Sequence, residues 1–157
     1  MNQSTRIESF GPVDLMGVVL YGNPSKVRFH DAWVHFGKVA DELALSRIDK
    51  NLYGLQVYPP TFPAVFEFTY MASIETNPGI TVPIRMLTKT VPRCTYAVQK
   101  VIGGVDGIDE ALQYLYREYI PAKGLKVAMP FDFEKYCNVR SQDHLQGDIE
   151  VWVPVEQ

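Results

Sequence analysis

A strand–helix–strand–strand pattern occurs twice along the 157-residue chain, and this repetition restricts the possible folds more than any other feature of the sequence. In the first half, β-rich sequence over 7–21 leads into a helical stripe that we expect to begin at Ser25 and to extend to about Leu45. Two apolar strands over 52–58 and 65–74 complete this half.

The second half shows the same order of elements. Strands are expected over 84–87, 96–102, 131–136 and 148–155. A helix over 108–120 should begin after Asp106 as its N-cap and stop at Pro121, because proline lacks the backbone N–H that a helix interior requires. The repetition lies in the pattern of elements rather than in sequence identity.

Two such units predict an α+β fold, in which two tandem β-α-β-β modules form one antiparallel sheet. The helices should cover one face of this sheet, which leaves the other face free to become concave. A groove between the two halves is then the natural place for a ligand. We expect a single domain over 1–157, with pseudo-repeats at about 5–78 and 82–157.

Charge and hydropathy exclude several classes of protein. The formal net charge is −3, which argues against binding to nucleic acid through clustered Lys and Arg. The longest uncharged run, over 52–66, is interrupted by glycine and proline and is shorter than a membrane-spanning helix. The N-terminal residues show no signal-peptide pattern, and Cys94 and Cys137 are isolated from each other. We therefore expect a cytoplasmic protein that contacts neither membrane nor nucleic acid.

No motif for a metal or cofactor is found in the sequence. The three histidines, His30, His35 and His144, do not form a ligand pattern, and the two cysteines form no cluster. The glycine-rich segment 103–107 lacks the lysine of a phosphate-binding loop and the spacing of a dinucleotide fingerprint. We expect no metal and no cofactor.

The last predicted strand alternates strictly between two faces. Side chains on a strand alternate with a period of two, so Ile149, Val151 and Val153 should point toward the helices. Glu150 and Trp152 should share the opposite face, where a carboxylate beside an indole would suit an organic cation. The residues alone equally permit a half-solvated strand with incidental packing of the indole.

Aromatic residues are numerous, with 9 Tyr, 8 Phe and 2 Trp. Tyrosine offers an apolar ring and a polar tip, which suits a pocket that accepts varied ligands. The candidate wall residues are Trp33, Phe36, Phe68, Tyr70, Tyr96, Tyr119 and Trp152. The spacing of Trp33 and Phe36 is equally typical of a helix packed on a sheet.

The Phe- and Tyr-rich strand of the first half leaves its face assignment open. In one register, Phe66, Phe68 and Tyr70 point into the groove. In the other register, Glu67 and Thr69 do so.

Four short motifs in the second half occur in a characteristic order and spacing. They occupy 91–98 (VPRCTYAV), 116–124 (YREYIPAKG), 133–136 (FEKY) and 148–155 (DIEVWVPV), with a weaker match at 68–72. This series resembles the GyrI-like small-molecule-binding family, whose domain is the effector-binding domain of several AraC-type and MerR-type transcription activators. The resemblance implies two tandem modules and a drug- or effector-binding groove between them.

The resemblance also implies roles for individual residues. Glu150 would face the ligand. Because a buried carboxylate must be satisfied, we expect tyrosine hydroxyls or water to hydrogen-bond Glu150 in the empty protein. Glu134 and Tyr136 would be structural or would line the rim of the groove. We assign no catalytic residue.

The function expected is that of a stand-alone effector- or multidrug-binding protein for amphipathic, cationic organic molecules, rather than that of an enzyme. One alternative is a hydrolase of electrophilic compounds in which Glu150 assists an attacking water. The other is a protein-interaction module similar to gyrase inhibitors. A homodimer or a regulatory protein partner is compatible with each of these functions.

Overall fold

The computed structural model describes residues 5–42, 51–137 and 148–157. Its strands are β1 (Thr5–Phe10), β2 (Val13–Gly22), β3 (Leu52–Val57), β4 (Phe68–Glu75), β5 (Leu87–Val91), β6 (Cys94–Lys100), β7 (Lys126–Val127), β8 (Phe131–Cys137) and β9 (Asp148–Glu156). Its helical elements are α1 (His30–Glu42), the 3-10 turn η3 (Gly104–Gly107), α2 (Ile108–Tyr114), the π-helical turn η4 (Leu115–Tyr119) and α3 (Ile120–Ala122). The fold is α+β, as predicted.

The described strands form one antiparallel sheet in the order β1-β6-β9-β8-β3-β4-β2-β5, with β7 paired to β9. β3 and β8 pair with each other at its centre. On one side follow β4, β2 and β5, and on the other follow β9, β6 and β1. β1 and β5 therefore each lie at the edge beside strands of the opposite half, and the division into repeats at 5–78 and 82–157 stays a prediction.

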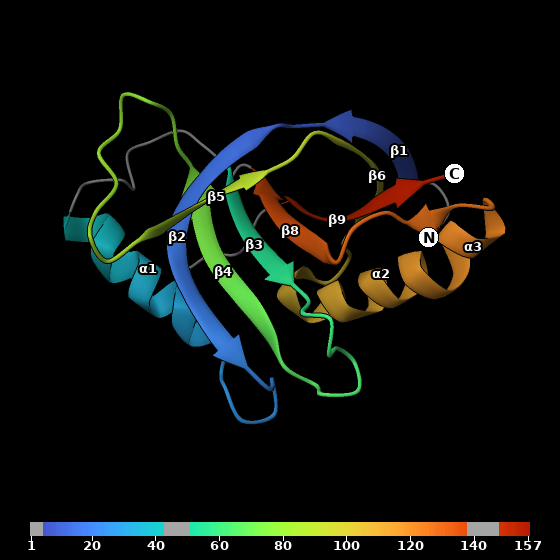
Figure 1. The fold of residues 1–157 in the computed structure, drawn as a ribbon, viewed down its shortest axis with the longest axis horizontal. Coiled ribbons are helices and arrows are strands. Elements are labelled where there is room, and N and C mark those ends of the chain that lie inside the picture. The colour runs from blue at the N-terminus through green and yellow to red at the C-terminus, as the bar shows by residue number, and fades with distance from the viewer. Residues whose placement is uncertain (1–4, 43–50, 138–147) are drawn as a thin grey trace.

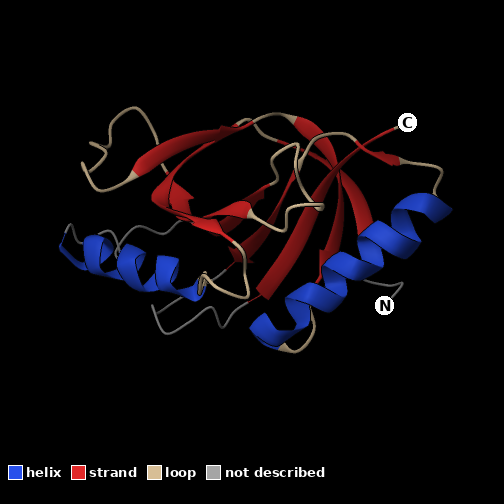
Figure 2. Ribbon diagram, turned by 60° about the horizontal axis from the view of Figure 1, so that its bottom comes forward, coloured by secondary structure: helices blue, strands red, loops and turns tan. Residues whose placement is uncertain are grey.

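Both helices lie on the same side of the curled sheet (Figures 1 and 2). α1 packs on β2 and β4, and α2 packs on β6 and β9. The predicted alternation of β9 is confirmed, because Ile149, Val151 and Val153 join the apolar cluster under α2. No helix in the described ranges is long and apolar enough to cross a membrane.

The face of the sheet opposite the helices is not the open groove that the sequence predicts. Trp152, Phe133 and Tyr96 are buried there in a second apolar cluster. Figure 1 shows β1 and β2 arching across the sheet, and Phe10 at the end of β1 packs on Trp152 with a ring-centroid distance of 5.1 Å. Because the sheet curls, its own side chains fill this concave face.

The first helix begins later than predicted, at His30 rather than at Ser25. The Asn23 side chain accepts a hydrogen bond from the Ser25 backbone N–H at 2.8 Å. An Asx turn, in which an Asn side chain bonds the backbone two residues on, thus replaces the predicted helix start. The predicted helix end at Leu45 lies outside the described residues.

The second helix starts where the sequence predicts but is capped differently. Gly107 is the N-cap of α2, and Asp106 belongs to the preceding 3-10 turn. Pro121 does not end the helical segment, which continues to Ala122. A π-helical turn lies just before Pro121, so the proline falls in the first turn of a new register, where no backbone N–H has to be donated.

The strand predicted over 84–87 begins only at Leu87 and extends to Val91. A hydrogen bond from the Met86 N–H to the Pro83 carbonyl closes a turn over the residues before it. Pro83 also has no backbone N–H to donate to a neighbouring strand, which disfavours an extended strand here.

Gly17 is required where β2 and β4 pair. A Cβ added there would contact the Ala72 carbonyl oxygen and lie 2.7 Å from the Ser73 Cα. These are backbone atoms that no change of rotamer can move. We expect Gly17→Ala to lower the free energy of unfolding by about 1–3 kcal/mol, the range for overpacking a filled interior.

Urea unfolding measures this effect, with Gly79→Ala as the control. Gly79 is exposed, and a Cβ there would lie 3.3 Å from the Asn77 Oδ1 atom. Equal stability of the two variants would contradict the close approach at Gly17.

Candidate functional site

The helix side of β3 and β8 lies between the two helices. α1 packs on β2 and β4 and α2 packs on β6 and β9, so the central pair of strands runs between their packing sites (Figure 1). Alternate side chains of β8, namely Asp132, Glu134 and Tyr136, point to this side, since Tyr136 packs in the cluster under α2. Two carboxyl groups therefore lie on the helix side of the central pair of strands.

Glu134 is a buried carboxylate held by hydroxyl groups. The residue is 4% exposed. The Tyr70 and Tyr136 hydroxyls both donate to Oε1, the second at 2.9 Å. The Gln56 Nε2 group donates to Oε2 at a longer distance, 3.4 Å. The Trp33 indole N–H donates to the Tyr70 hydroxyl at 2.8 Å and links α1 to this network.

Asp132 is held in the same way but less completely. The residue is 0% exposed. The Tyr58 and Tyr116 hydroxyls both donate to Oδ2, at 2.8 Å and 2.7 Å. Oδ1 is buried and has no hydrogen-bond partner among the residues that the structure describes. Tyr116 connects this carboxyl group to the helical segment of the second half.

Burial controls the ionisation of both acids. Desolvation raises the pKa of Asp132 from its ordinary 3.8 to about 7, although the two tyrosine hydroxyls oppose the shift. Desolvation, together with the nearby Asp132, raises the pKa of Glu134 from 4.5 to about 7. Burial also raises the pKa of all four tyrosines well above its usual value, so they remain hydrogen-bond donors.

A glycine makes room for the Glu134 carboxylate. Gly54 is paired with Glu134 across the centre of the sheet. A Cβ at Gly54 would contact the Glu134 Oε1 atom and the Tyr70 hydroxyl. Glycine inside a strand often marks such a close approach, so Gly54 was a signal in the sequence that could have pointed to this site.

Four of the predicted wall residues gather on the α1 side of this network. Trp33 and Tyr70 belong to the network itself, and Phe36 packs against Trp33 with ring centroids 5.6 Å apart. Phe68 packs against Phe29 at 5.0 Å. Phe68 and Tyr70 therefore lie on the helix side of β4, because Tyr70 packs with the residues of α1 and Phe68 lies two residues before it.

Three other predicted residues lie on the opposite face of the sheet. The cationic groups beside them are side chains of the protein, namely Arg6 and Lys135. Glu150, whose side chain is 16% exposed, forms an ion pair with Arg6 at 2.6 Å. The Arg6 guanidinium and the Lys135 ammonium lie 5.5 Å and 5.2 Å from the Trp152 ring centroid. Trp152 and Tyr96 are buried in the cluster on that face. The hydroxyl partners expected for Glu150 are found on Glu134 instead.

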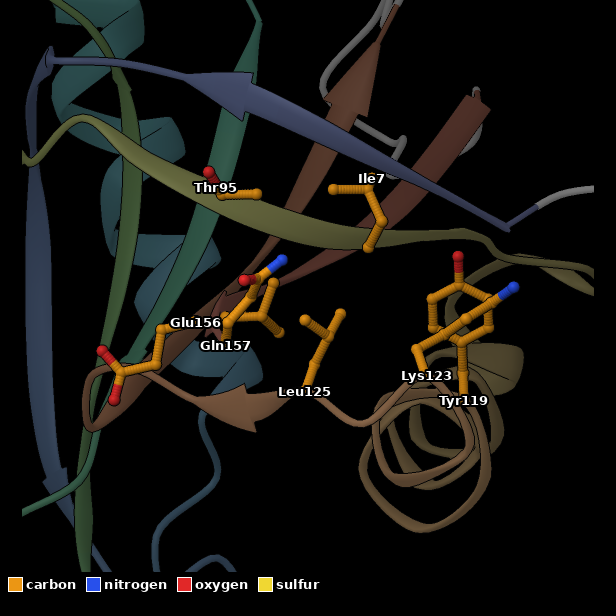
Figure 3. Close-up of a pocket in the computed structure, with 8 residues that line it drawn as sticks. Ile7, Thr95, Tyr119, Lys123, Leu125, Glu156 and Gln157 are labelled. Atoms are coloured by element: carbon orange, nitrogen blue, oxygen red, sulfur yellow. The ribbon is translucent and has the colours of Figure 1, made fainter.

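Tyr119 lines a separate cavity of about 560 Å³ between the end of the helical segment and the edge of the sheet (Figure 3). The Lys123 ammonium lies 5.7 Å from the centroid of the Tyr119 ring. The lining residues are Ile7, Thr95, Tyr119, Lys123, Leu125, Val155, Glu156 and Gln157. None of them belongs to the network around Glu134 and Asp132.

From the sequence, Glu134 was expected to be structural or to line the rim of the groove, and Asp132 was overlooked. The alternation of Asp132, Glu134 and Tyr136 along one strand was the available signal, since acids on a strand that also carries apolar residues need partners. In the described part of the chain, no group of three or more His, Cys, Asp or Glu side chains is arranged to hold a metal ion.

Comparison with known proteins assigns the family. Residues 6–155 match the family described as integron-associated effector binding protein, Cass2. The chain belongs to this family. The predicted relation to GyrI-like effector-binding proteins is thereby confirmed. No curated protein matches the sequence significantly.

Solved structures share the fold at low sequence identity. The integron cassette protein VCH_CASS2 from the mobile metagenome of Vibrio cholerae is 17% identical, with a TM-score of 0.72 over 98% of this chain and 97% of that chain. SAV2435, solved with bound tetraphenylphosphonium, is 13% identical, with a TM-score of 0.72 over 97% and 93%. The C-terminal domain of EcmrR is 11% identical, with a TM-score of 0.68 over 98% and 97%.

Proposed function

We propose that this Cass2-family protein binds an amphipathic organic cation between α1 and α2, with Glu134 as its counter-ion. The observation that carries the proposal is a buried carboxylate oriented by two tyrosine hydroxyls, with no cationic partner among the described residues. The sequence suggested Glu150 for this role. Glu150 is already neutralised by Arg6, so Glu134 suits an external cation better.

The electrostatics of the empty site favour a cation over a neutral ligand. Since burial raises the pKa of Glu134 to about 7, the carboxyl group is readily protonated and requires no counter-charge when the site is empty. A bound cation would favour the ionised form. The attraction between the two charges then grows as the ligand excludes water.

The surrounding rings supply the apolar part of the site. Trp33 is partly exposed beside the Glu134 network, and the Phe29 ring stacks on Tyr70 at 5.5 Å. An aromatic face adds about 0.5–2 kcal/mol to the binding of a cation. SAV2435, which shares this fold, was solved with bound tetraphenylphosphonium, an aromatic cation. This supports the same class of ligand for the present protein.

Calorimetric titration with tetraphenylphosphonium and with tetraphenylborate, an anion of similar size, tests the proposal. We expect the wild type to bind the cation and not the anion. Glu134→Gln should weaken cation binding at least about tenfold, which corresponds to about 1.4 kcal/mol.

Glu150→Gln is the matched control and should leave the affinity unchanged, because Glu150 is on the opposite face and is paired with Arg6. Equal binding of the cation and the anion, or undiminished binding by Glu134→Gln, would rule out Glu134 as the counter-ion.

The two alternative functions stay predictions. A carboxyl group with a pKa near 7 suits general acid–base catalysis, so Glu134 fits the hydrolase role better than the ion-paired Glu150. Conversion of an electrophilic ligand by the wild type, absent in Glu134→Gln, would favour this second candidate.

A further inference from the structure

The two buried carboxyl groups each have one well-bonded oxygen and one poorly bonded oxygen. Glu134 Oε1 accepts from two tyrosines, whereas the one hydrogen bond to Oε2 from the residues that the structure describes is the long contact with Gln56. Asp132 Oδ2 accepts from two tyrosines, whereas Oδ1 has no partner among the described residues. The same arrangement thus occurs twice on one strand.

The tyrosines determine which oxygens remain open. Their hydroxyls are held as donors, and all four point to Oε1 or Oδ2. A buried polar atom without a partner destabilises the fold, so Asp132 Oδ1 requires an explanation. Protonation of Oδ1 would not supply one, because the resulting O–H would in turn need an acceptor.

The spacing of the two acids is set by the strand. Asp132 and Glu134 are two residues apart on β8 and share a face, so their Cα atoms are roughly 6.6 Å apart along the strand. We propose that Asp132 is a second polar subsite beside Glu134 and that the ligand carries two cationic N–H donors at this spacing, as an aromatic diamine does. This inference rests on the proposed function and adds the chemical class of the ligand.

Aromatic side chains surround Asp132. Tyr58 and Tyr116, which cover Asp132, are themselves partly exposed. Tyr58 packs on Phe62 and Phe68 with ring centroids 4.6 Å and 5.3 Å away. Since Asp132 is fully buried in the empty protein, a donor reaches Oδ1 when one of the covering tyrosines shifts. An aryl group between two amines would then lie along these rings.

The ionisation of both acids supplies an independent readout. Burial raises the pKa of Asp132 and of Glu134 to about 7, so slightly below neutral pH both groups are largely protonated in the empty protein. A ligand with one cationic centre would ionise Glu134 alone. A ligand with two would ionise both and release more protons, a difference that a purely structural role for Asp132 would not produce.

The test compares p-xylylenediamine with 4-methylbenzylamine, which keeps the ring and one amine. Calorimetry at pH 6, in buffers of different ionisation enthalpy, gives the affinity and the number of protons released. For the wild type we expect the diamine to bind at least about tenfold more tightly and to release more protons than the monoamine. Asp132→Asn should remove both differences, while Glu134→Gln should weaken both ligands.

Tetraphenylphosphonium distinguishes a failure of the second subsite from a failure of the proposed function. It has no N–H donor, so it should bind Asp132→Asn as tightly as it binds the wild type. If tetraphenylphosphonium binds through Glu134 but the wild type does not distinguish the two amines, the second subsite is refuted and the proposed function stands. If no cation binds, both are refuted. If Asp132→Asn fails to fold, the wild-type preference and proton release still decide the question.

Discussion

The free energy of unfolding of the empty protein is expected to fall as the pH rises from about 4 to about 7. Asp132 and Glu134 have a folded pKa of about 7, against ordinary values of 3.8 and 4.5. In this window the folded state binds more protons than the unfolded state, so stability decreases with pH. The expected loss is on the order of 3 kcal/mol for each carboxyl group, because one pKa unit corresponds to about 1.4 kcal/mol.

Urea unfolding at a series of pH values measures this profile. The double variant Asp132→Asn, Glu134→Gln is the control and should show a much flatter profile between pH 4 and pH 7, since neither replacement titrates. A wild-type protein whose stability is constant or increases across this window would contradict the burial of two protonated acids. A saturating cation should also flatten the profile, because it stabilises the ionised form.

Trp152→Ala is expected to lower the free energy of unfolding by about 3–5 kcal/mol, the range for removing a large aromatic side chain from a core. Trp152 is 1% exposed and stacks on Phe133 with ring centroids 5.6 Å apart. It also packs against Tyr96 and Phe10 at 5.7 Å and 5.1 Å. Its removal would leave a cavity on the helix-free face of the sheet.

Trp152→Phe is the matched variant. The indole Nε1 is buried and has no hydrogen-bond partner among the described residues, so phenylalanine removes an unsatisfied donor while retaining a ring. We expect it to preserve most of the stability that alanine loses. Urea unfolding at constant pH measures both variants. A small loss in Trp152→Ala would instead indicate that Trp152 is exposed in a groove, as the sequence suggested.

The periodicity of the sequence was sufficient for the architecture. The alternation of Ile149, Val151 and Val153 predicted the face of β9 that the second helix covers, and the structure confirms it. The helical stripes and the α+β class were likewise predictable, because these patterns depend on neighbours along the chain. Element boundaries were less predictable, as at Ser25 and Pro121, since hydrogen bonds with Asn23 and a π-helical turn determine them.

The same alternation placed Glu150 and Trp152 together correctly but could not say what surrounds them. Arg6 is 144 residues before Glu150 in the chain, and only the pairing of β1 with β6, next to β9, brings the two side chains together. The interpretation of an acid beside an indole as a cation site was chemically sound, but Arg6 and Lys135 supply the cations.

By itself, the sequence determined the class of fold, the two faces of the last strand and a composition suited to an aromatic site, because these properties arise from residues close together in the chain. Only the tertiary structure decided which acids are buried with no counter-ion among the described residues, namely Asp132 and Glu134. The hydroxyls that hold Asp132 and Glu134 come from four tyrosines on separate segments: Tyr58, Tyr70, Tyr116 and Tyr136. Tyr136 lies on the same strand as both acids, whereas Tyr58, Tyr70 and Tyr116 reach them only through the fold. Folding, rather than residue type, therefore makes Glu134 different from Glu150.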